Sequence, residues 1–381
     1  VIPYDSDELK GVWIRPTYYN EEDIIKTIDK IYNAGINNIF LETYYHGQTI
    51  FPSQTMTKYG FIRQNENYIG FDPLRIWINE AHRRGIKVHI WFETFYVGNK
   101  PPETNAGYIL AKKPEWANYQ KKNADSETIA YSVSEHNGYF IDPANPEVQN
   151  FLYELLCEII TRYKPDGINL DYIRYPQSLD TIYSNYDMSN WGYTKYAREE
   201  FAKMYGVDPI ELKFTDPLWY QWRAYRCNKV TSFVRRVSVL CRFNKIAITT
   251  VIFPNRNLAL NTKMQDWKTW SMNNFVDGFT PLFLTCNDMT AMNLMEEVLR
   301  NKSASTKLYA GLFVTFMNGS SADLMKQIHA ARKYCLNGLI IFDYAHLSDY
   351  YVNTLTESVF KPNRKEVIIT ETAKPQQAQY R

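Results

Sequence analysis

The chain contains the stretch Lys-Pro-Asp-Gly-Ile-Asn-Leu-Asp-Tyr-Ile-Arg-Tyr-Pro at residues 164–176. Pro165 and Gly167 end the helical pattern before it, and a short apolar run then finishes in Asp171, Arg174 and two tyrosines. Such an ending is typical of a parallel strand that carries functional groups at the carboxyl end of a barrel. A buried strand with a structural ion pair between Asp171 and Arg174 is the alternative interpretation.

Strand and helix patterns alternate over nearly the whole chain, outward from this stretch in both directions. Eight apolar runs alternate with segments that have helical spacing of apolar residues. Eight such units predict an α/β protein, a closed (β/α)8 TIM barrel rather than an open sheet. The expected strands lie at residues 10–16, 37–45, 86–92, 164–176, 246–253, 276–284, 307–316 and 338–342.

The connections after several strands are long. Residues 46–70 and 94–143 are polar and aromatic, and loops of this length are usually functional. Residues 177–217 form an insertion with one expected short helix. We predict one barrel domain at residues 1–361 and a short peripheral C-terminal tail at residues 362–381.

The composition excludes some classes of partner. Lys plus Arg number 43 and Asp plus Glu number 41. This near-balance of charge gives no electrostatic reason to expect a nucleic-acid partner. No apolar run approaches the roughly 18 residues that span a bilayer. The 30 Tyr, 20 Phe and 9 Trp are an unusual excess, and such rings stack on the faces of sugars. The sequence therefore indicates a carbohydrate partner, and it leaves the oligomeric state open.

Four acids stand at the ends of expected strands: Glu42, Glu93, Asp171 and Asp343. The active site of a barrel lies at these ends. Glycosidic bond cleavage needs one protonated carboxyl to donate to the leaving oxygen and one ionised carboxyl to attack or to activate water. We therefore predict Asp171 as nucleophile or base, with Glu93 or Asp343 as general acid. Each acid could instead cap a helix or pair with an arginine.

Other side chains at the same ends are aromatic or charged, and suit binding of a sugar. We predict as substrate-binding residues Trp13, Arg15, Glu42, Tyr44, His46, Trp91, Tyr172, Arg174 and Tyr344.

Other hydrolytic chemistries find less support. The chain has six histidines and no His-x-His, so we predict neither a metal site nor a cofactor. No Gly-x-Ser-x-Gly motif is present, which disfavours a serine hydrolase of that type. Two alternatives to a glycosidase stay open: a non-catalytic carbohydrate-binding barrel and a metal-dependent barrel hydrolase.

Six segments resemble glycosyl-hydrolase-like family ten, a family of glycoside-hydrolase-like TIM-barrel proteins formerly catalogued as a domain of unknown function. The most specific of them is Asp-Gly-Ile-Asn-Leu-Asp-Tyr-Ile-Arg-Tyr-Pro. The resemblance implies a (β/α)8 barrel that hydrolyses carbohydrate, often in secreted, periplasmic or envelope-attached bacterial proteins, and a cytoplasmic location stays open. It does not imply a particular sugar. The segments lie at residues 8–14, 48–53, 71–74, 80–92, 142–146 and 166–176.

Some positions depart from known patterns. Glu93 stands where the family more often has a small polar residue, and residues 42–44 also differ, so this chain either uses different acids or binds substrate there. The fourth strand also resembles that of chitinase-like barrels, but Asn169 replaces an Asp and Ile173 occupies the position of the acid catalyst. Residues 309–316 of the seventh strand carry no acid, so paired glutamates on strands four and seven are not supported.

Overall fold

The computed structural model describes residues 7–17, 19–104, 108–126, 128–356 and 360. Its centre is a closed barrel of parallel strands, because β1 pairs in parallel with both β2 and β10. A short β3 (Gln48–Thr49) forms an antiparallel hairpin with the end of β2. The barrel strands are β1 (Leu9–Ile14), β2 (Asn38–Tyr45), β4 (Lys87–Glu93), β5 (Gly167–Asp171), β6 (Ala247–Thr250), β7 (Gly278–Phe279) with β8 (Leu282–Phe283), β9 (Lys307–Phe313) and β10 (Gly338–Phe342).

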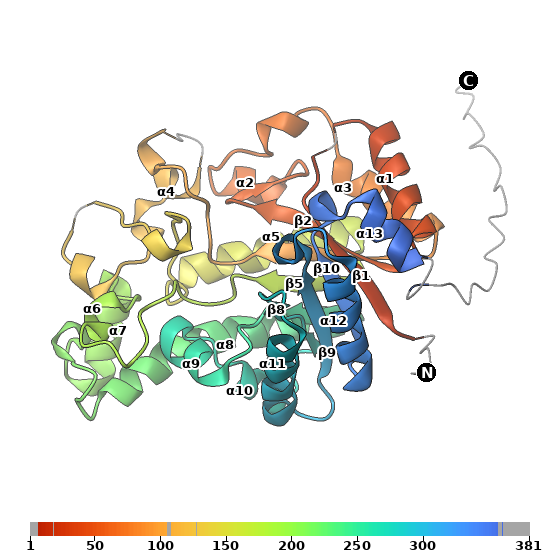
Figure 1. The fold of residues 1–381 in the computed structure, drawn as a ribbon. Coiled ribbons are helices and arrows are strands. Elements are labelled where there is room, and N and C mark those ends of the chain that lie inside the picture. Colours follow the sequence, from red (N-terminus) through yellow and green to blue (C-terminus); the bar gives the residue numbers. More distant parts are fainter. Residues whose placement is uncertain (1–6, 18, 105–107, 127, 357–359, 361–381) are drawn as a thin grey trace, which may run out of the picture.

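Helices surround the barrel (Figure 1). Side chains at N-cap positions fix where several of them begin: the side-chain oxygens of Asn20, Asp72, Asn145 and Asn287 accept backbone N–H groups of the first turns. The outer layer comprises α1 (Glu21–Asn33), α3 (Pro73–Arg83), α5 (Pro146–Tyr163), α8 (Trp219–Phe243), α9 (Arg256–Lys263), α10 (Trp267–Met272), α11 (Asp288–Asn301), α12 (Ser321–Lys333) and α13 (Asp349–Thr354).

The long connections build a lobe beside the barrel, at the left in Figure 1. It contains α4 (Ile109–Lys112), α6 (Tyr186–Ser189) and α7 (Lys195–Tyr205), whereas α2 (Gln54–Lys58) follows the β2–β3 hairpin. The insertion has its own small hydrophobic cluster, in which Phe201 of α7 packs against Trp222 and Tyr225 of α8. The lobe is therefore anchored to the barrel through α8.

The predicted TIM barrel is confirmed, with each expected strand in its place. Two details differ. The sixth strand is divided into β7 and β8 at Thr280 and Pro281, since proline has no N–H for a strand ladder. The seventh ends at Phe313, because residues 314–317 turn into a 3-10 helix. The sequence interpretation also missed α9 and α10. The predicted tail, residues 362–381, lies outside the described residues.

Gly167, in the stretch that predicts the fold, allows a close contact inside the barrel. The His89 ring stacks on Phe40 with 4.4 Å between ring centroids, and its Nε2 lies 2.8 Å from Asn38 Oδ1. A Cβ atom at position 167 would lie 2.4 Å from His89 Nδ1 and 3.1 Å from the backbone oxygen of Ala247. Only glycine leaves room for the imidazole here.

We expect Gly167→Ala to lower the free energy of unfolding by about 1–3 kcal/mol, the usual cost of overpacking a core. Urea titration of the wild-type and variant proteins measures this loss. In a His89→Ala background the same substitution should cost less, because the clashing ring is gone. An equal cost in both backgrounds would contradict the proposed contact.

Candidate active site

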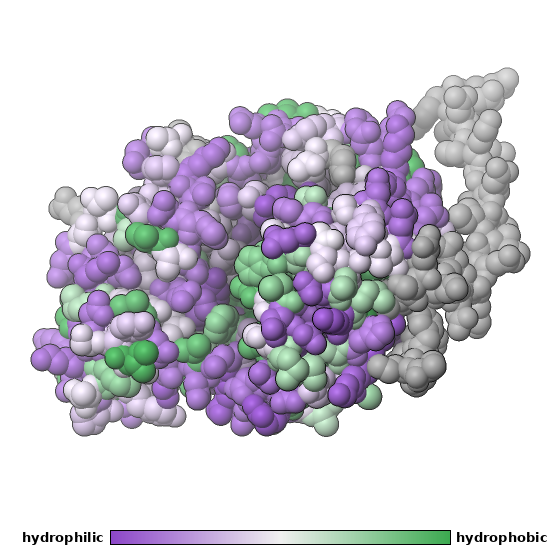
Figure 2. Space-filling model, viewed as in Figure 1, coloured by the Kyte–Doolittle hydropathy of each residue, from purple (hydrophilic) through white to green (hydrophobic). Residues whose placement is uncertain are grey.

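The carboxyl ends of the barrel strands and the long loops enclose a cleft of about 800 Å³. Figure 2 shows this face of the molecule hollowed between the barrel and the lobe of α4, α6 and α7. The cleft is continuous with the strand ends, where barrel active sites lie. The predicted site residues that line it are Arg15, His46, Trp91, Glu93, Asp171, Tyr172 and Arg174.

Asp171 ends β5 and is held by two N–H donors. The Trp91 indole donates to Oδ2 at 2.8 Å, and the backbone N–H of Tyr172 donates to Oδ1 at 2.7 Å. Tyr172 has a positive φ of 46°, which turns the chain sharply just after the acid. Burial raises the pKa of Asp171, whereas the two N–H donors and the positive charges of Arg174 and Arg15 oppose that rise. The donors therefore stabilise the ionised form of this carboxyl.

Glu93 ends β4 directly beside Asp171, since the two residues are register partners in neighbouring strands. Its side chain is 3% exposed, and Oε1 accepts the backbone N–H of His46 at 3.0 Å. Burial raises the pKa of Glu93 well above its usual range, and the negative charges of Glu42 and Asp171 raise it further. The backbone bond and Arg15 oppose this only in part. Glu93 is therefore the acid best suited to hold a proton at neutral pH.

Arg15, which lines the cleft, forms a two-pronged ion pair with Glu42, which lies beneath the cleft surface. Arg15 Nε lies 2.7 Å from Glu42 Oε1, and a second guanidinium nitrogen lies 3.3 Å from Oε2. Glu42 is 1% exposed, and its burial raises its pKa to about 7 despite the opposing charge of Arg15. The guanidinium also lies over the Tyr45 ring, 4.3 Å from its centroid. The pair thus presents Arg15, and not Glu42, to the cleft.

Aromatic rings form the apolar part of the cleft. Phe342 of β10 stacks on Phe313 at 5.2 Å between centroids and meets Trp91 edge-on at 5.7 Å. Beneath them the indole of Trp13 donates to Asn169 Oδ1 at 3.2 Å, and Asn169 in turn donates to Thr249 and Thr280 at 2.9 and 3.0 Å. This buried network fixes the position of the aromatic surface above it.

The opposite wall carries charged groups from three separate segments. Arg174 lies 2.7 Å from Glu135 Oε2 and 4.8 Å from the centroid of the Tyr172 ring. Lys263, at the end of α9, has its Nζ 4.0 Å from Glu135 Oε1 and 3.3 Å from Gln177 Oε1. Burial lowers the pKa of Lys263 to about 7, and repulsion by Arg174 adds to the effect. A buried ammonium with so few close partners weakens the fold at neutral and acidic pH.

Replacing Lys263 with methionine tests how much the burial of its ammonium group lowers the free energy of unfolding. In the unfolded chain the pKa of a lysine is ~10.4. Between pH 7 and that value the lysine is therefore protonated in the unfolded chain and largely neutral in the folded one. Wild-type stability should therefore gain up to ~1.4 kcal/mol per pH unit over this window relative to Lys263→Met. The stability advantage of the variant should shrink as pH rises from neutral, as measured by urea titration at several pH values. The exposed Lys195→Met serves as control, and parallel curves for Lys263→Met and wild type would contradict the assignment.

Five predicted site residues do not line the cleft. Trp13 and Glu42 lie just beneath its surface, at 1% exposure each. The Asp343 carboxylate is buried and lies 2.5 Å from His346 Nδ1, and Tyr344 follows it, half-buried, in a 3-10 turn. Direct contact of these four side chains with substrate therefore stays a prediction, and Trp13 and Glu42 are placed to support Asn169 and Arg15.

Tyr44 is predicted at the rim, but its side chain has no exposed surface and its ring packs on Phe92 and on Phe151 of α5. The reason is an irregularity in the pairing of β2 with β4. Glu42 is paired with Trp91, whereas Tyr44 is paired with Phe92, so one extra residue lies between them. Such a bulge reverses the faces of the residues beyond it. Tyr44 therefore faces the helix layer and not the cleft, and a substrate contact at this residue stays a prediction.

The sequence interpretation missed several residues that line the cleft, among them Tyr45, Tyr96, Glu135 and Lys263. Tyr45 takes the place predicted for Tyr44, as a consequence of the bulge. Tyr96 stacks on Tyr172 with 4.6 Å between ring centroids. Glu135 comes from the connection between β4 and α5, and no local pattern distinguishes it from other loop acids.

Two further properties concern only the residues that the structure describes. Among them, no group of three or more His, Cys, Asp or Glu side chains is arranged to hold a metal ion. No helix in the same set is long and apolar enough to cross a membrane.

The fold and the cleft define a TIM barrel with acids at the carboxyl ends of its strands. Residues 8–318 match the family model described as glycosyl hydrolase-like 10. The chain belongs to this family, as its sequence motifs predict.

Two of the curated relatives are named glycosyl hydrolases. DigH of Escherichia coli (strain K12) is 28% identical over 165 residues, which cover 42% of this chain and 35% of DigH. YngK of Bacillus subtilis (strain 168) is 22% identical over 184 residues, covering 47% of this chain and 32% of YngK. The chain thus matches about a third of the length of these relatives.

Solved structures similar to this chain include glycosidases. An α-galactosidase from Lactobacillus brevis superposes with a TM-score of 0.56 at 13% identity, over 93% of this chain and 40% of that one. The catalytic domain of a β-amylase from Paenibacillus polymyxa gives 0.55 at 11% identity, over 91% and 94% of the two chains. At such low identity the likeness shows the fold alone.

Proposed function

We propose that this chain hydrolyses glycosidic bonds in a polysaccharide or glycan, with Glu93 as general acid and Asp171 as nucleophile or base. The observation that carries the proposal is the placement of these two carboxyls side by side in one open cleft with different partners. Neighbouring parallel strands lie about 4.8 Å apart, so both acids can reach one sugar linkage. Glycosidases need such a pair, with one carboxyl protonated and the other ionised.

The surroundings of the two acids support these roles. Glu93 is buried, lies near two other carboxylates and accepts a single backbone N–H, so it holds its proton to a high pH. Asp171 accepts two N–H groups, from Trp91 and Tyr172, which favour its ionised form. When a proton is available to only one of the two, these contacts direct it to Glu93.

The remaining cleft residues suit the binding of a sugar. Trp91, Phe342 and Phe313 offer faces and edges for stacking, while Arg15 and Arg174 can donate hydrogen bonds to hydroxyl or carbonyl oxygens. Family membership and the glycosidase relatives support the same conclusion.

The test is an assay of the purified chain against a panel of polysaccharides and oligosaccharides, with affinity and reducing-end release measured on each. We expect time-dependent release that persists in the presence of a metal chelator. Binding to a glycan without any release would instead support the alternative of a non-catalytic carbohydrate-binding barrel. Release that a chelator abolishes and added metal restores would favour a metal-dependent hydrolase.

A further inference from the structure

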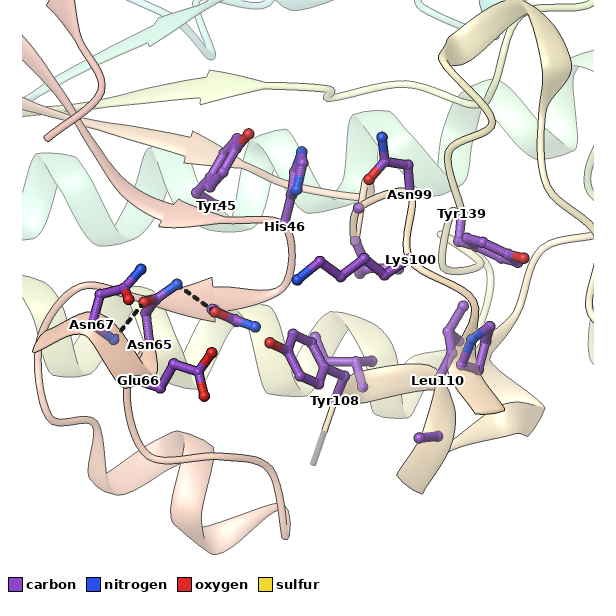
Figure 3. Close-up of a pocket in the computed structure, with 16 residues that line it drawn as sticks. Tyr45, His46, Asn65, Glu66, Asn67, Asn99, Lys100, Tyr108, Leu110 and Tyr139 are labelled. Atoms are coloured by element: carbon purple, nitrogen blue, oxygen red, sulfur yellow. Dashed lines mark hydrogen bonds between the residues drawn. The ribbon is translucent and has the colours of Figure 1, made fainter. Parts of the chain in front are cut away.

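A second cavity, the side pocket, opens next to the cleft and has a volume of about 250 Å³. It lies between the β2–β3 hairpin and the segment that follows β4 (Figure 3). Tyr45, His46 and Asn99 line both the side pocket and the cleft. The two cavities are therefore neighbours with a shared wall, and a chain-like ligand could occupy both.

The shared wall is fixed by close backbone packing. Gly98 has a φ of +97°, and a Cβ atom there would lie 3.0 Å from the Cβ atom of His46. Only glycine combines this conformation with this approach. Two backbone hydrogen bonds tie the segment to Tyr139, from Val97 N to Tyr139 O at 2.9 Å and from Tyr139 N to Gly98 O at 2.8 Å. The wall that Val97 and Gly98 give to the side pocket is thus held in place by backbone contacts.

The far wall carries a chain of amide side chains, visible at the left of Figure 3. Asn65 Nδ2 donates to Gln48 Oε1 at 2.6 Å, and the backbone N–H of Asn67 donates to Asn65 Oδ1 at 3.0 Å. Asn65 is itself held to β3 by a backbone bond to Thr49 of 2.8 Å. The ring of Tyr108 lies across the pocket from Asn65 and Glu66 in the same view.

The lining has the chemistry of a site for an uncharged sugar. Its one acid, Glu66, and its one lysine, Lys100, balance in charge. Burial lowers the pKa of His46 to about 4, with the charges of Arg15 and Lys100 adding to the effect, so the imidazole is neutral at physiological pH. His46 stacks on Tyr45 with 3.8 Å between centroids, which gives a flat apolar surface. Flat rings and amide groups together recognise sugar faces and their hydroxyl or N-acyl substituents.

One contact links the side pocket to the acid pair. His46, in the shared wall, donates its backbone N–H to Glu93 Oε1 at 3.0 Å. Glu93 is assigned to protonate the leaving oxygen. The part of the substrate on the same side of Glu93 as His46 and the side pocket is therefore the leaving group. The side pocket, at about 250 Å³, is smaller than the roughly 300–1,000 Å³ of pockets for drug-sized ligands. Its size therefore suits a single sugar unit.

We propose that the side pocket binds a neutral sugar unit on the leaving-group side of the cleaved bond. This inference rests on the proposed glycosidase function and on Glu93 as its general acid. Binding energy gained there, away from the reacting atoms, can be used to raise the rate of bond cleavage. Substrates extended at the reducing end, which is the leaving-group end, should therefore be cleaved faster than short ones.

The test uses oligosaccharides of the glycan that the protein cleaves, from disaccharide to hexasaccharide. For the wild-type chain we expect kcat/KM to rise about tenfold when a unit reaches the side pocket, the gain typical of an aromatic contact. Tyr108→Ala should lose this gain and keep the wild-type rate on the shortest substrate. Lys100→Ala, at an exposed position, repeats the test without risk to folding. Tyr220→Ala, an exposed tyrosine on α8, is the matched control.

Two outcomes overturn the inference. One is a kcat/KM that does not depend on length, and the other is an unchanged length dependence in both pocket variants. Failure of the wild-type chain to cleave any glycan is a different result, which overturns the proposed function. In that case calorimetric titration with cello-, chito- and malto-oligosaccharides still tests the side pocket, because affinity should rise with length in the wild-type chain and not in Tyr108→Ala.

Discussion

Replacing Asp171 with asparagine should lower kcat/KM on any glycan that the protein cleaves by at least about 10³-fold. Asparagine keeps the shape of the side chain and can still accept an N–H group, but it has no charge with which to attack a sugar or activate water. Binding of the glycan should survive, because the rings of Trp91 and Phe342 stay in the cleft even though one of the two N–H donors to position 171 loses its acceptor. Steady-state kinetics together with calorimetric titration separate the two effects.

Asp166→Asn is the matched control. Asp166 immediately precedes β5, at the opposite end of the barrel from Asp171, and its carboxylate accepts the backbone N–H of Val88 at 2.8 Å and lies 2.7 Å from His82. The same chemical change there should leave kcat/KM within about twofold of wild type, since distant sites act independently. Near wild-type activity of Asp171→Asn, or equal losses in the two variants, would contradict the role of Asp171.

Replacing Glu93 with glutamine should cost about 10²–10⁴-fold in kcat/KM on natural glycans, the usual contribution of a general acid. Aryl glycosides with acidic phenol leaving groups need little protonation, so the loss on them should be much smaller. A comparison of the two substrate classes for the wild-type and variant proteins measures this difference. An equal loss on both classes would show that Glu93 does not protonate the leaving oxygen.

The pH profile gives a second check on Glu93. The proposed mechanism needs Glu93 protonated and Asp171 ionised, so kcat/KM should fall on the acid side as Asp171 takes up a proton and on the alkaline side as Glu93 loses one. The raised pKa of Glu93 places the alkaline limb well above the ordinary range of a glutamate. In Glu93→Gln the alkaline limb should disappear while the acid limb stays.

Much of the fold could be predicted from local signals. Proline and glycine stops, capping residues and apolar periodicity are short-range features, and they located each barrel strand, including β5 with Asp171 at its end. The same logic placed Arg15, Glu93 and Arg174 correctly at the cleft. The division of the sixth strand depends on how Pro281 fits the sheet, which apolar periodicity does not reveal.

The cleft could be predicted only in part, for two physical reasons. The alternation of side chains between the two faces of a strand fails at a bulge. Because of the extra residue between Glu42 and Tyr44, the structure places Tyr45 at the rim, where Tyr44 was predicted. Long-range partners leave no local pattern either. Nothing in the sequence pairs Glu135 with Arg174, or places Lys263 against both, because the three come from separate segments that meet only in the folded chain.

The most direct test of the central claim is a crystal structure of the Asp171→Asn protein with an oligosaccharide that the wild-type protein cleaves. The account predicts a linkage oxygen about 3 Å from the Glu93 carboxyl, within hydrogen-bonding reach, and the anomeric carbon of the same linkage facing the side chain at position 171. A bound linkage whose nearest acid is Asp343 or Glu135, with Glu93 out of reach, would contradict it.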